Sequence, residues 1–96
     1  MNFWTWGGKY IGYKTNDDIL YSYKGDPIGK FYGEELFDFD GTYIGEVKNT
    51  NRIIVRTSKK NYRRSAICKP CSRCATSSYC DYVGYVMYVG YEDFKI

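Results

Sequence analysis

Residues 36–47 read LFDFDGTYIGEV, two short runs of apolar and aromatic residues separated by Asp40-Gly41. Asp-Gly between such runs predicts a tight β-hairpin turn, because the turn requires a positive φ that Gly adopts without steric cost. The same pattern occurs twice earlier, in residues 20–31 (LYSYKGDPIGKF) and 3–14 (FWTWGGKYIGYK). The chain therefore contains an internal repeat, which decides the architecture before any other feature is considered.

Two sets of glycines mark this repeat, and both are spaced by 17 and then 16 residues. The turn glycines are Gly8, Gly25 and Gly41, and the second glycines are Gly12, Gly29 and Gly45. A glycine in mid-strand is costly, so the second set indicates a β-bulge or a close approach between the backbone and a neighbouring aromatic ring. A ligand lying on these glycines is the less common alternative.

A fourth unit is expected from Arg52, with residues 53–55 as its incoming strand and its outgoing strand from Lys59 onward. The position 16 residues after Gly41 is Thr57, and the YIG pattern is absent, so this unit is degenerate, as terminal repeats often are. The sequence predicts an all-β fold, an antiparallel meander of about four β-hairpin units.

The composition supports this fold. The chain has 96 residues, so we expect a single domain, and 20% of the residues are aromatic, including 12 tyrosines. Large rings bury much area each and let a thin β structure close on them. We divide the chain into a β-hairpin repeat body at 1–60, a basic cysteine-rich segment at 61–80 and a tyrosine-rich closing segment at 81–96 that packs on the body.

Charge is distributed unevenly over these parts. Residues 1–46 hold 4 basic and 8 acidic side chains, whereas residues 47–80 hold 9 basic and no acidic ones. The N-terminus lacks the basic region and apolar run of a signal peptide, and no apolar run approaches the ~18 residues of a membrane span. We therefore expect a cytoplasmic protein with no membrane contact, whose cysteines are reduced or bound to metal.

Tyrosines recur at every third position from the end of the basic segment through the closing segment, at 79, 82, 85, 88 and 91. This period fits neither a strand nor a helix. Val83, Val86, Met87 and Val89 favour β structure, so we expect a buried final strand that packs on the body or on a second copy. The chain is too small to bury all these rings, and we predict that Tyr82, Tyr85, Tyr88 and Tyr91 anchor a protein partner or self-association.

The three units, with Phe-Trp at residues 3–4, resemble the small bacterial proteins named for a four-fold β-flower domain. The resemblance covers Phe3 to about Thr57. It implies four β-hairpin units arranged as petals about a pseudo-four-fold axis, a basic stretch that residues 59–73 match loosely, and a closing motif ending in Phe that residues 91–94 match loosely. The cysteines and the weak fourth unit depart from the family pattern. The family brings no assigned activity and no functional residues.

Four cysteines form a candidate metal site in the basic segment: Cys68, Cys71, Cys74 and Cys80. Four thiolates can complete a tetrahedral zinc site, and C-x2-C-x2-C with a further cysteine also occurs in iron–sulfur proteins. The segment is short of apolar residues, so a metal would provide order that a core cannot. Free thiols or disulfides are the alternative to zinc, because cysteine spacing alone does not determine the chemistry.

The basic run at 48–73 is a candidate nucleic-acid surface, with Lys59, Lys60, Arg63 and Arg64 as the phosphate-contacting residues. A solvated linker is the alternative, since the sequence pI is 8.6 and no nucleic-acid fold signature is present. Enzyme chemistry finds little support, because the chain has no histidine. We expect a non-enzymatic protein-interaction or structural module; the alternative is a zinc-stabilised module that binds nucleic acid.

Overall fold

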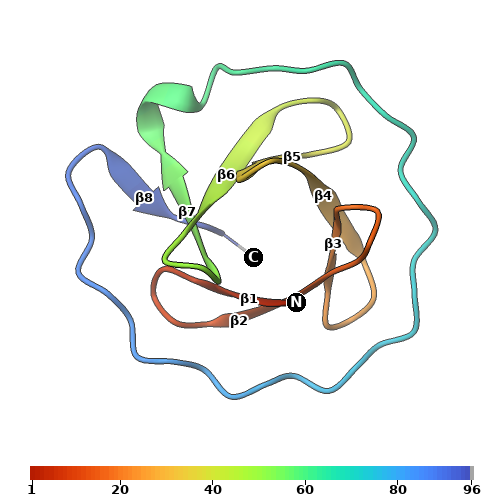
Figure 1. The fold of residues 1–96 in the computed structure, drawn as a ribbon, viewed down its shortest axis with the longest axis horizontal. Coiled ribbons are helices and arrows are strands. Elements are labelled where there is room, and N and C mark those ends of the chain that lie inside the picture. The colour runs from red at the N-terminus through yellow and green to blue at the C-terminus, as the bar shows by residue number, and fades with distance from the viewer. Residues whose placement is uncertain (96) are drawn as a thin grey trace.

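The computed structural model describes residues 1–95 and arranges them as a closed barrel encircled by its own chain (Figure 1). The strands are β1 (Asn2–Thr5), β2 (Tyr10–Lys14), β3 (Ile19–Ser22), β4 (Pro27–Tyr32), β5 (Glu35–Phe37), β6 (Tyr43–Lys48), β7 (Arg52–Arg56) and β8 (Tyr91–Asp93), with a 3-10 turn η1 (Thr57–Lys59) after β7. Strands β1 to β7 pair antiparallel in chain order, and β1 pairs parallel with β7 to close the barrel. The predicted all-β hairpin meander is confirmed.

Three equivalent hairpins, β1–β2, β3–β4 and β5–β6, form the barrel together with β7. In each, one register pair precedes a β-bulge: Phe3 with Gly12, Leu20 with Gly29, and Leu36 with Gly45. A Cβ on Gly12 would lie 1.8 Å from the carbonyl oxygen of Tyr21, and one on Gly29 would lie 2.4 Å from that of Phe37. The expected bulges are present, and at these two glycines the close neighbour is the backbone of the next hairpin rather than an aromatic ring.

The hairpin turns have the same geometry three times. Thr5 N–H donates to Lys9 O, and Gly8 N–H donates back to Thr5 O, which is the pattern of a three-residue loop ending in a left-handed residue. Gly8, Gly25 and Gly41 have φ of 96°, 94° and 92°, as the turn chemistry predicts. Two residues after each turn glycine stand Tyr10, Pro27 and Tyr43. The N–H groups of the two tyrosines bind Asp81 and Tyr62 rather than the neighbouring strand, so the proline at position 27 removes no hydrogen bond of the hairpin ladder.

The fourth unit differs from the expectation. The chain after β7 does not turn back at Lys59 but forms η1 and leaves the barrel. Strand β8 takes the place of the expected outgoing strand. It pairs with β7 through Arg56 with Tyr91 and Ile54 with Asp93. Thr57 occupies the turn-glycine position, and its β-branched side chain disfavours the positive φ that the tight turn requires. The prediction of an outgoing strand from Lys59 is therefore wrong.

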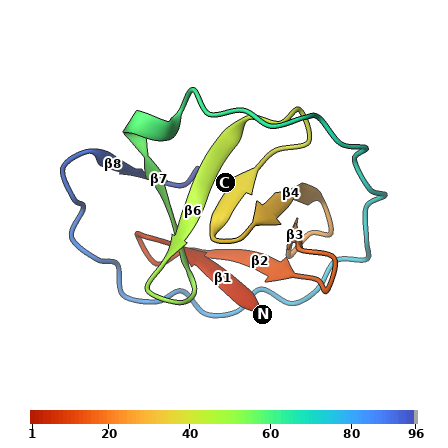
Figure 2. The same cartoon turned by 45° about the horizontal axis from the view of Figure 1, so that its top comes forward.

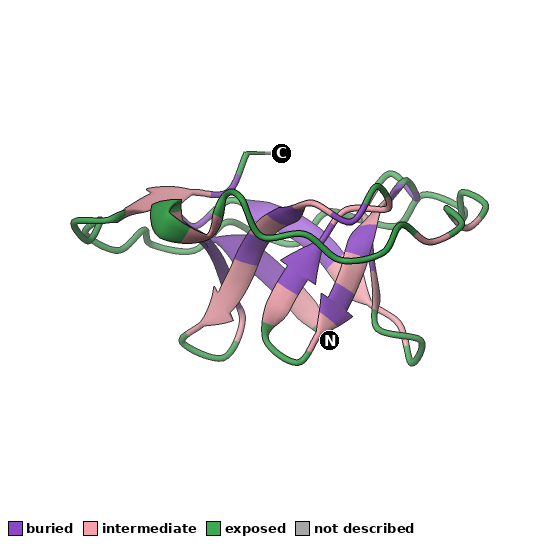
Figure 3. Cartoon of the chain, turned by 90° about the horizontal axis from the view of Figure 1, so that it is seen from above, coloured by how far each residue is buried: buried purple, intermediate pink, exposed green. Residues whose placement is uncertain are grey.

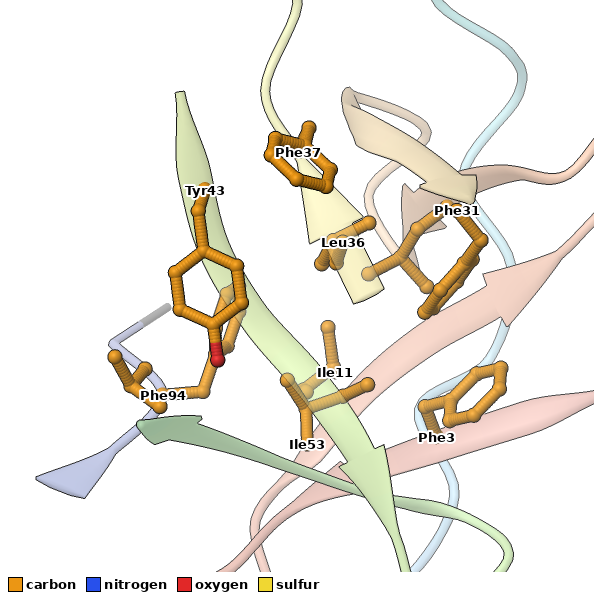
Figure 4. Packing of buried hydrophobic residues seen from close by; sticks show 10 residues of the cluster. Phe3, Ile11, Phe31, Leu36, Phe37, Tyr43, Ile53 and Phe94 are labelled. Atoms are coloured by element: carbon orange, nitrogen blue, oxygen red, sulfur yellow. The ribbon is translucent and has the colours of Figure 1, made fainter. Parts of the chain in front are cut away.

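The core lies inside the barrel (Figure 4). It consists of Phe3, Ile11, Leu20, Phe31, Leu36, Phe37, Tyr43, Ile53, Val55 and Phe94. Phe94 is 8% exposed and joins this cluster from the far end of the chain. The buried part of the expected C-terminal strand is thus smaller than predicted, because Tyr91–Asp93 are half-buried and residues 79–89 are exposed.

The molecule is a flat disc of 35 × 32 × 18 Å. Figure 2 shows residues 60–90 running around the outside of the barrel, and Figure 3 shows the loops between hairpins at the end of the barrel where the N-terminus lies. We call residues 60–90 the belt. Among residues 1–95, no helix has the length and apolar character that crossing a membrane requires.

Candidate interaction surface: the belt

The belt is docked on the three hairpins at intervals of nine residues. Its direction is opposite to chain order, so it passes the third hairpin first and the first hairpin last (Figure 1). At each hairpin a belt N–H donates to the carbonyl of the turn glycine: Arg64 to Gly41 at 2.7 Å, Arg73 to Gly25 at 2.8 Å, and Tyr82 to Gly8 at 2.7 Å. Three residues later a second belt N–H donates to the backbone carbonyl of an aromatic residue in the same turn: Ile67 to Phe39, Thr76 to Tyr23, and Tyr85 to Trp6.

The turn glycines have a second role in this docking. A Cβ on Gly8 would lie 2.0 Å from the carbonyl oxygen of Tyr82, and one on Gly25 would lie 1.8 Å from that of Arg73. No side chain fits at these distances. The repeated glycine therefore both permits the positive φ of the turn and leaves room for the belt backbone.

Side chains at the nine-residue positions stack on barrel aromatics. The Arg64 guanidinium carbon lies 4.2 Å from the ring centroid of Tyr32, and that of Arg73 lies 5.3 Å from the ring of Tyr21. On the first hairpin the Tyr82 ring takes the same place and stacks on Trp4 with centroids 4.1 Å apart. Cation–π contacts and aromatic stacking thus add to the backbone hydrogen bonds between belt and barrel.

The predicted interaction tyrosines face the barrel. Tyr85 and Tyr88 pack on Trp6 with ring centroids 4.8 and 5.5 Å away, and the Tyr91 hydroxyl accepts from Arg56 Nη2 at 2.6 Å. Together with Tyr82 they are brought to one side of the disc. They are intramolecular anchors in this structure, with 47–49% of Tyr82, Tyr85 and Tyr88 still exposed.

The buried side chain of Arg52 links the first hairpin to the belt beside Tyr82 and Tyr85. This side chain is 4% exposed, its Nη1 donates to the carbonyl of Trp6 at 3.2 Å and its Nη2 donates to that of Val83 at 2.9 Å. The guanidinium also lies under the rings of Tyr82 and Tyr85. A buried cation that is hydrogen-bonded and covered by rings holds the belt segment 82–85 firmly on the barrel.

A row of outward residues was missed by the sequence analysis. Val83, Val86 and Val89 are 87%, 87% and 102% exposed. The missed signal is the period of three itself, which is the repeat of an extended polyproline II chain: one residue in three faces the barrel and another faces solvent.

The four cysteines occupy the same outward row as the valines, since 68, 71, 74 and 80 differ from 83 by multiples of three. All four are free and exposed. Across residues 1–95, no group of three or more His, Cys, Asp or Glu side chains is close enough to hold a metal ion. The structure therefore does not bring these thiols together, and zinc binding at Cys68, Cys71, Cys74 and Cys80 stays a prediction that would require the belt to change shape.

Each of the predicted phosphate-contacting residues has a partner within the chain. Lys59 Nζ lies 2.7 Å from Glu35 Oε2 and 3.3 Å from Glu46 Oε1, and the hydrogen bond to Glu35 raises the pKa of this lysine. Lys60 pairs with Glu92 at 2.5 Å.

The two predicted arginines are also engaged. Arg63 Nη1 donates to Thr42 Oγ1 at 2.8 Å, and Arg64 stacks on Tyr32 as described above. Binding of nucleic acid by this segment stays a prediction, and it would compete with the internal contacts of all four residues.

Carboxylates near the turns act as backbone caps. Asp93 Oδ1 and Oδ2 accept from the N–H groups of Trp6 and Gly7, both at 2.9 Å, and Asp81 Oδ1 accepts from Tyr10 N–H at 3.0 Å. Asp38 Oδ1 accepts from Asp40 N–H at 3.0 Å, inside the turn of the third hairpin.

Known proteins give no guide to the function of this chain, so the functional proposal rests on the geometry described above. The chain matches no family model, no curated protein and no solved structure. The resemblance to the four-fold β-flower proteins stays a prediction.

Proposed function

We propose that the protein is a non-enzymatic self-association module and that belt residues 82–89 form its contact surface. The observation that carries this proposal is the row of three almost fully exposed valines, Val83, Val86 and Val89, on an ordered segment. Residues 82–91, YVGYVMYVGY, contain no charged side chain. Such an apolar, uncharged and exposed stretch is typical of a surface that another chain covers.

The belt presents this row in a form ready for pairing. Tyr82, Tyr85 and Tyr88 hold the segment on the barrel, so little conformational entropy remains to be lost on association. Within residues 1–95, the N–H groups of Val83, Val86 and Val89 make no hydrogen bond to the protein. A second extended segment could therefore add backbone hydrogen bonds as well as apolar contacts, as in strand-addition complexes.

A second copy of the same segment is the partner we propose. Val-rich segments without charge or proline pair readily with their own kind, and neither copy opposes the other by charge. Complete burial of a valine contributes about 1.5–3 kcal/mol, and a micromolar dissociation constant corresponds to about 8 kcal/mol. Six fully buried valines would contribute about 9–18 kcal/mol, and association costs about 4–15 kcal/mol, so a micromolar dimer requires nearly complete burial of all six side chains.

We place this function in the cytoplasm, because the four thiols are free and exposed, which suits a reducing compartment.

Sedimentation equilibrium of the full chain tests the proposal. We expect the wild-type protein to dimerise. The variant V83T/V86T/V89T should raise the dissociation constant by at least ~10-fold, because threonine keeps the shape of valine but has a hydroxyl in place of one methyl group, and that hydroxyl is costly to bury. S77T is the matched control, since Ser77 lies in the same outward row on another part of the belt. A wild-type protein that stays monomeric at millimolar concentration would overturn the proposal.

A further inference from the structure

The belt crosses from the third hairpin to the second on a span that carries two cysteines. Ile67 N–H donates to Phe39 O at 3.1 Å at one end, and Arg73 N–H donates to Gly25 O at 2.8 Å at the other. Between them the sequence is Cys68-Lys69-Pro70-Cys71-Ser72, and among residues 1–95 no hydrogen bond ties this stretch to the barrel. Both thiols are exposed. The span is therefore held at its two ends and free in the middle.

The two thiols are too far apart to bond while the span is extended. Residues three apart in a polyproline II chain are separated by about 9 Å, whereas the Cα atoms of a disulfide lie at most about 7 Å apart and commonly about 5.5–6 Å. Forming the bond would shorten the span by roughly 3 Å. Because the N–H groups of Ile67 and Arg73 are hydrogen-bonded to the barrel at the two ends of the span, a shortened span pulls on both of these anchors.

Space for a shortened span exists beneath it. A hollow of 430 Å³ lies between the second and third hairpins. It is lined by Pro27, Ile28, Asp38, Phe39 and Asp40, with Ile67 and Lys69 of the belt at its edge. The span can therefore bend inward, but only if the anchor at Ile67 or at Arg73 is released.

We propose that Cys68 and Cys71 form a redox modification site whose disulfide unlatches the belt between the second and third hairpins. The oxidant is a small-molecule disulfide. One cysteine thiolate attacks a sulfur of the oxidant and expels one thiol, which leaves a mixed disulfide on the protein. The other thiolate attacks the protein sulfur of that mixed disulfide and expels the second thiol. Two electrons pass from the cysteines to the oxidant, and both cysteine protons end on the released thiols.

This site goes beyond the proposed function. Its immediate effect is on the anchors at Ile67 and Arg73, including the stacking of Arg73 on Tyr13 and Tyr21. The self-association surface at residues 82–89 lies elsewhere on the belt, so a failure of one proposal leaves the other testable. Exposed, reversible cysteine pairs of this kind are typical of redox sensing in reducing compartments.

Hydrogen exchange of C74S/C80S tests the inference, since this variant keeps one cysteine pair. Titration with mixtures of oxidised and reduced glutathione is followed by mass, which distinguishes an internal disulfide from a glutathione adduct. We expect an internal disulfide, with exchange of the Ile67 or Arg73 amide at least ~10-fold faster than in the reduced protein. The variant with all four cysteines replaced by serine should show no change in the same buffers.

Two results would overturn the inference. One is an internal disulfide that leaves both amides as protected as in the reduced protein, because the belt would then have slack. The other is a product that contains glutathione adducts or dimers but no internal bond.

A second variant tests the tension in the belt. I67P in the C74S/C80S background removes the N–H donor but suits an extended chain. We expect its disulfide to form at an oxidised-to-reduced glutathione ratio at least ~10-fold lower than that of the parent. An unchanged midpoint, with Trp4 and Trp6 fluorescence showing an intact barrel, would count against the latch.

Discussion

The first three hairpins and the fourth unit make a similar strand pair from very different lengths of chain. In the first hairpin, Thr5 N–H donates to Lys9 O across a three-residue loop. In the fourth, Thr57 N–H donates to Gly90 O across a separation of 33 residues, which includes η1 and the whole belt. Closing the longer loop costs about 2 kcal/mol more in chain entropy.

The difference shows why the belt must be docked. A local hairpin can form from its turn and register alone, whereas β8 can reach β7 only after the chain has passed all three hairpins. The nine-residue anchors and the stacked rings offset the entropy of the long connection. Each repeat therefore makes one hairpin of the barrel and also one docking place for the belt, and the predictions below separate these two roles.

The largest effect is expected for Gly25→Ala. Its φ is +94°, and a Cβ would lie 1.8 Å from the carbonyl oxygen of Arg73, so the substitution strains the turn and also expels the belt. We expect a loss of about 3 kcal/mol in the free energy of unfolding, measured by urea denaturation.

Gly33→Ala is the matched control for this change. Gly33 also has positive φ, at +65°, but nothing lies within 4 Å of its Cβ position. It should lose only about 1 kcal/mol, from the backbone term. Equal losses in both variants would show that the belt contributes nothing at the turn glycines.

Phe94→Ala should lower the free energy of unfolding by nearly as much, about 3 kcal/mol. It removes a buried ring that joins the fourth unit, the β7–β8 pair, to the core. The amides of β8 should lose their hydrogen-exchange protection before those of the first three hairpins. Phe94→Leu is the conservative control and should keep most of the stability. Simultaneous loss of protection in all hairpins would mean that the fourth unit is not a separate step of opening.

A smaller effect is expected where the belt stacks on the first hairpin. Tyr82→Ala removes the ring that lies 4.1 Å from Trp4 and covers Arg52. We expect a loss of about 2 kcal/mol and faster amide exchange at Tyr85. Arg64→Ala, on the third hairpin, should lose only about 1 kcal/mol, because the site is more exposed. The reverse order would show that the basic half of the belt is the tighter one.

The smallest effect is a loss of stability at alkaline pH. Hydrogen bonding to Glu35 raises the pKa of Lys59, and burial raises the pKa of Tyr43, so both groups keep their protons longer in the folded state than in the unfolded state. Their contribution is therefore present below their unfolded pKa values of about 10, and it is lost as pH rises through the folded values.

Lys59→Met tests the lysine part of this dependence. We expect a loss of about 1 kcal/mol at pH 7 and a shallower fall in stability between pH 9 and 11, measured by denaturation in that range. Thr57, in the same 3-10 turn, offers the control Thr57→Ser, which keeps an Oγ like the one that donates to Gly90. A parallel fall in wild type and Lys59→Met would show that the ion pair does not set the alkaline limit.

Sequence reasoning reached the features that depend on neighbours along the chain. The spacing of Gly8, Gly25 and Gly41 predicts the three turns, and that of Gly12, Gly29 and Gly45 predicts the bulges. It failed at the fourth unit, where the partner of β7 lies beyond the belt. It also placed the tyrosines and the cysteines in separate motifs, although both follow one period of three along one extended chain.

The amino-acid sequence by itself determined the repeated hairpins, because a positive φ, a bulge and an apolar alternation are local requirements that particular residues meet. Only the tertiary structure decided which side of the belt faces solvent, where Arg52 and Phe94 lie, and that the cysteines are spread out rather than gathered. These features depend on the circumference of the closed barrel, which the belt must match in length. No short stretch of sequence encodes that circumference.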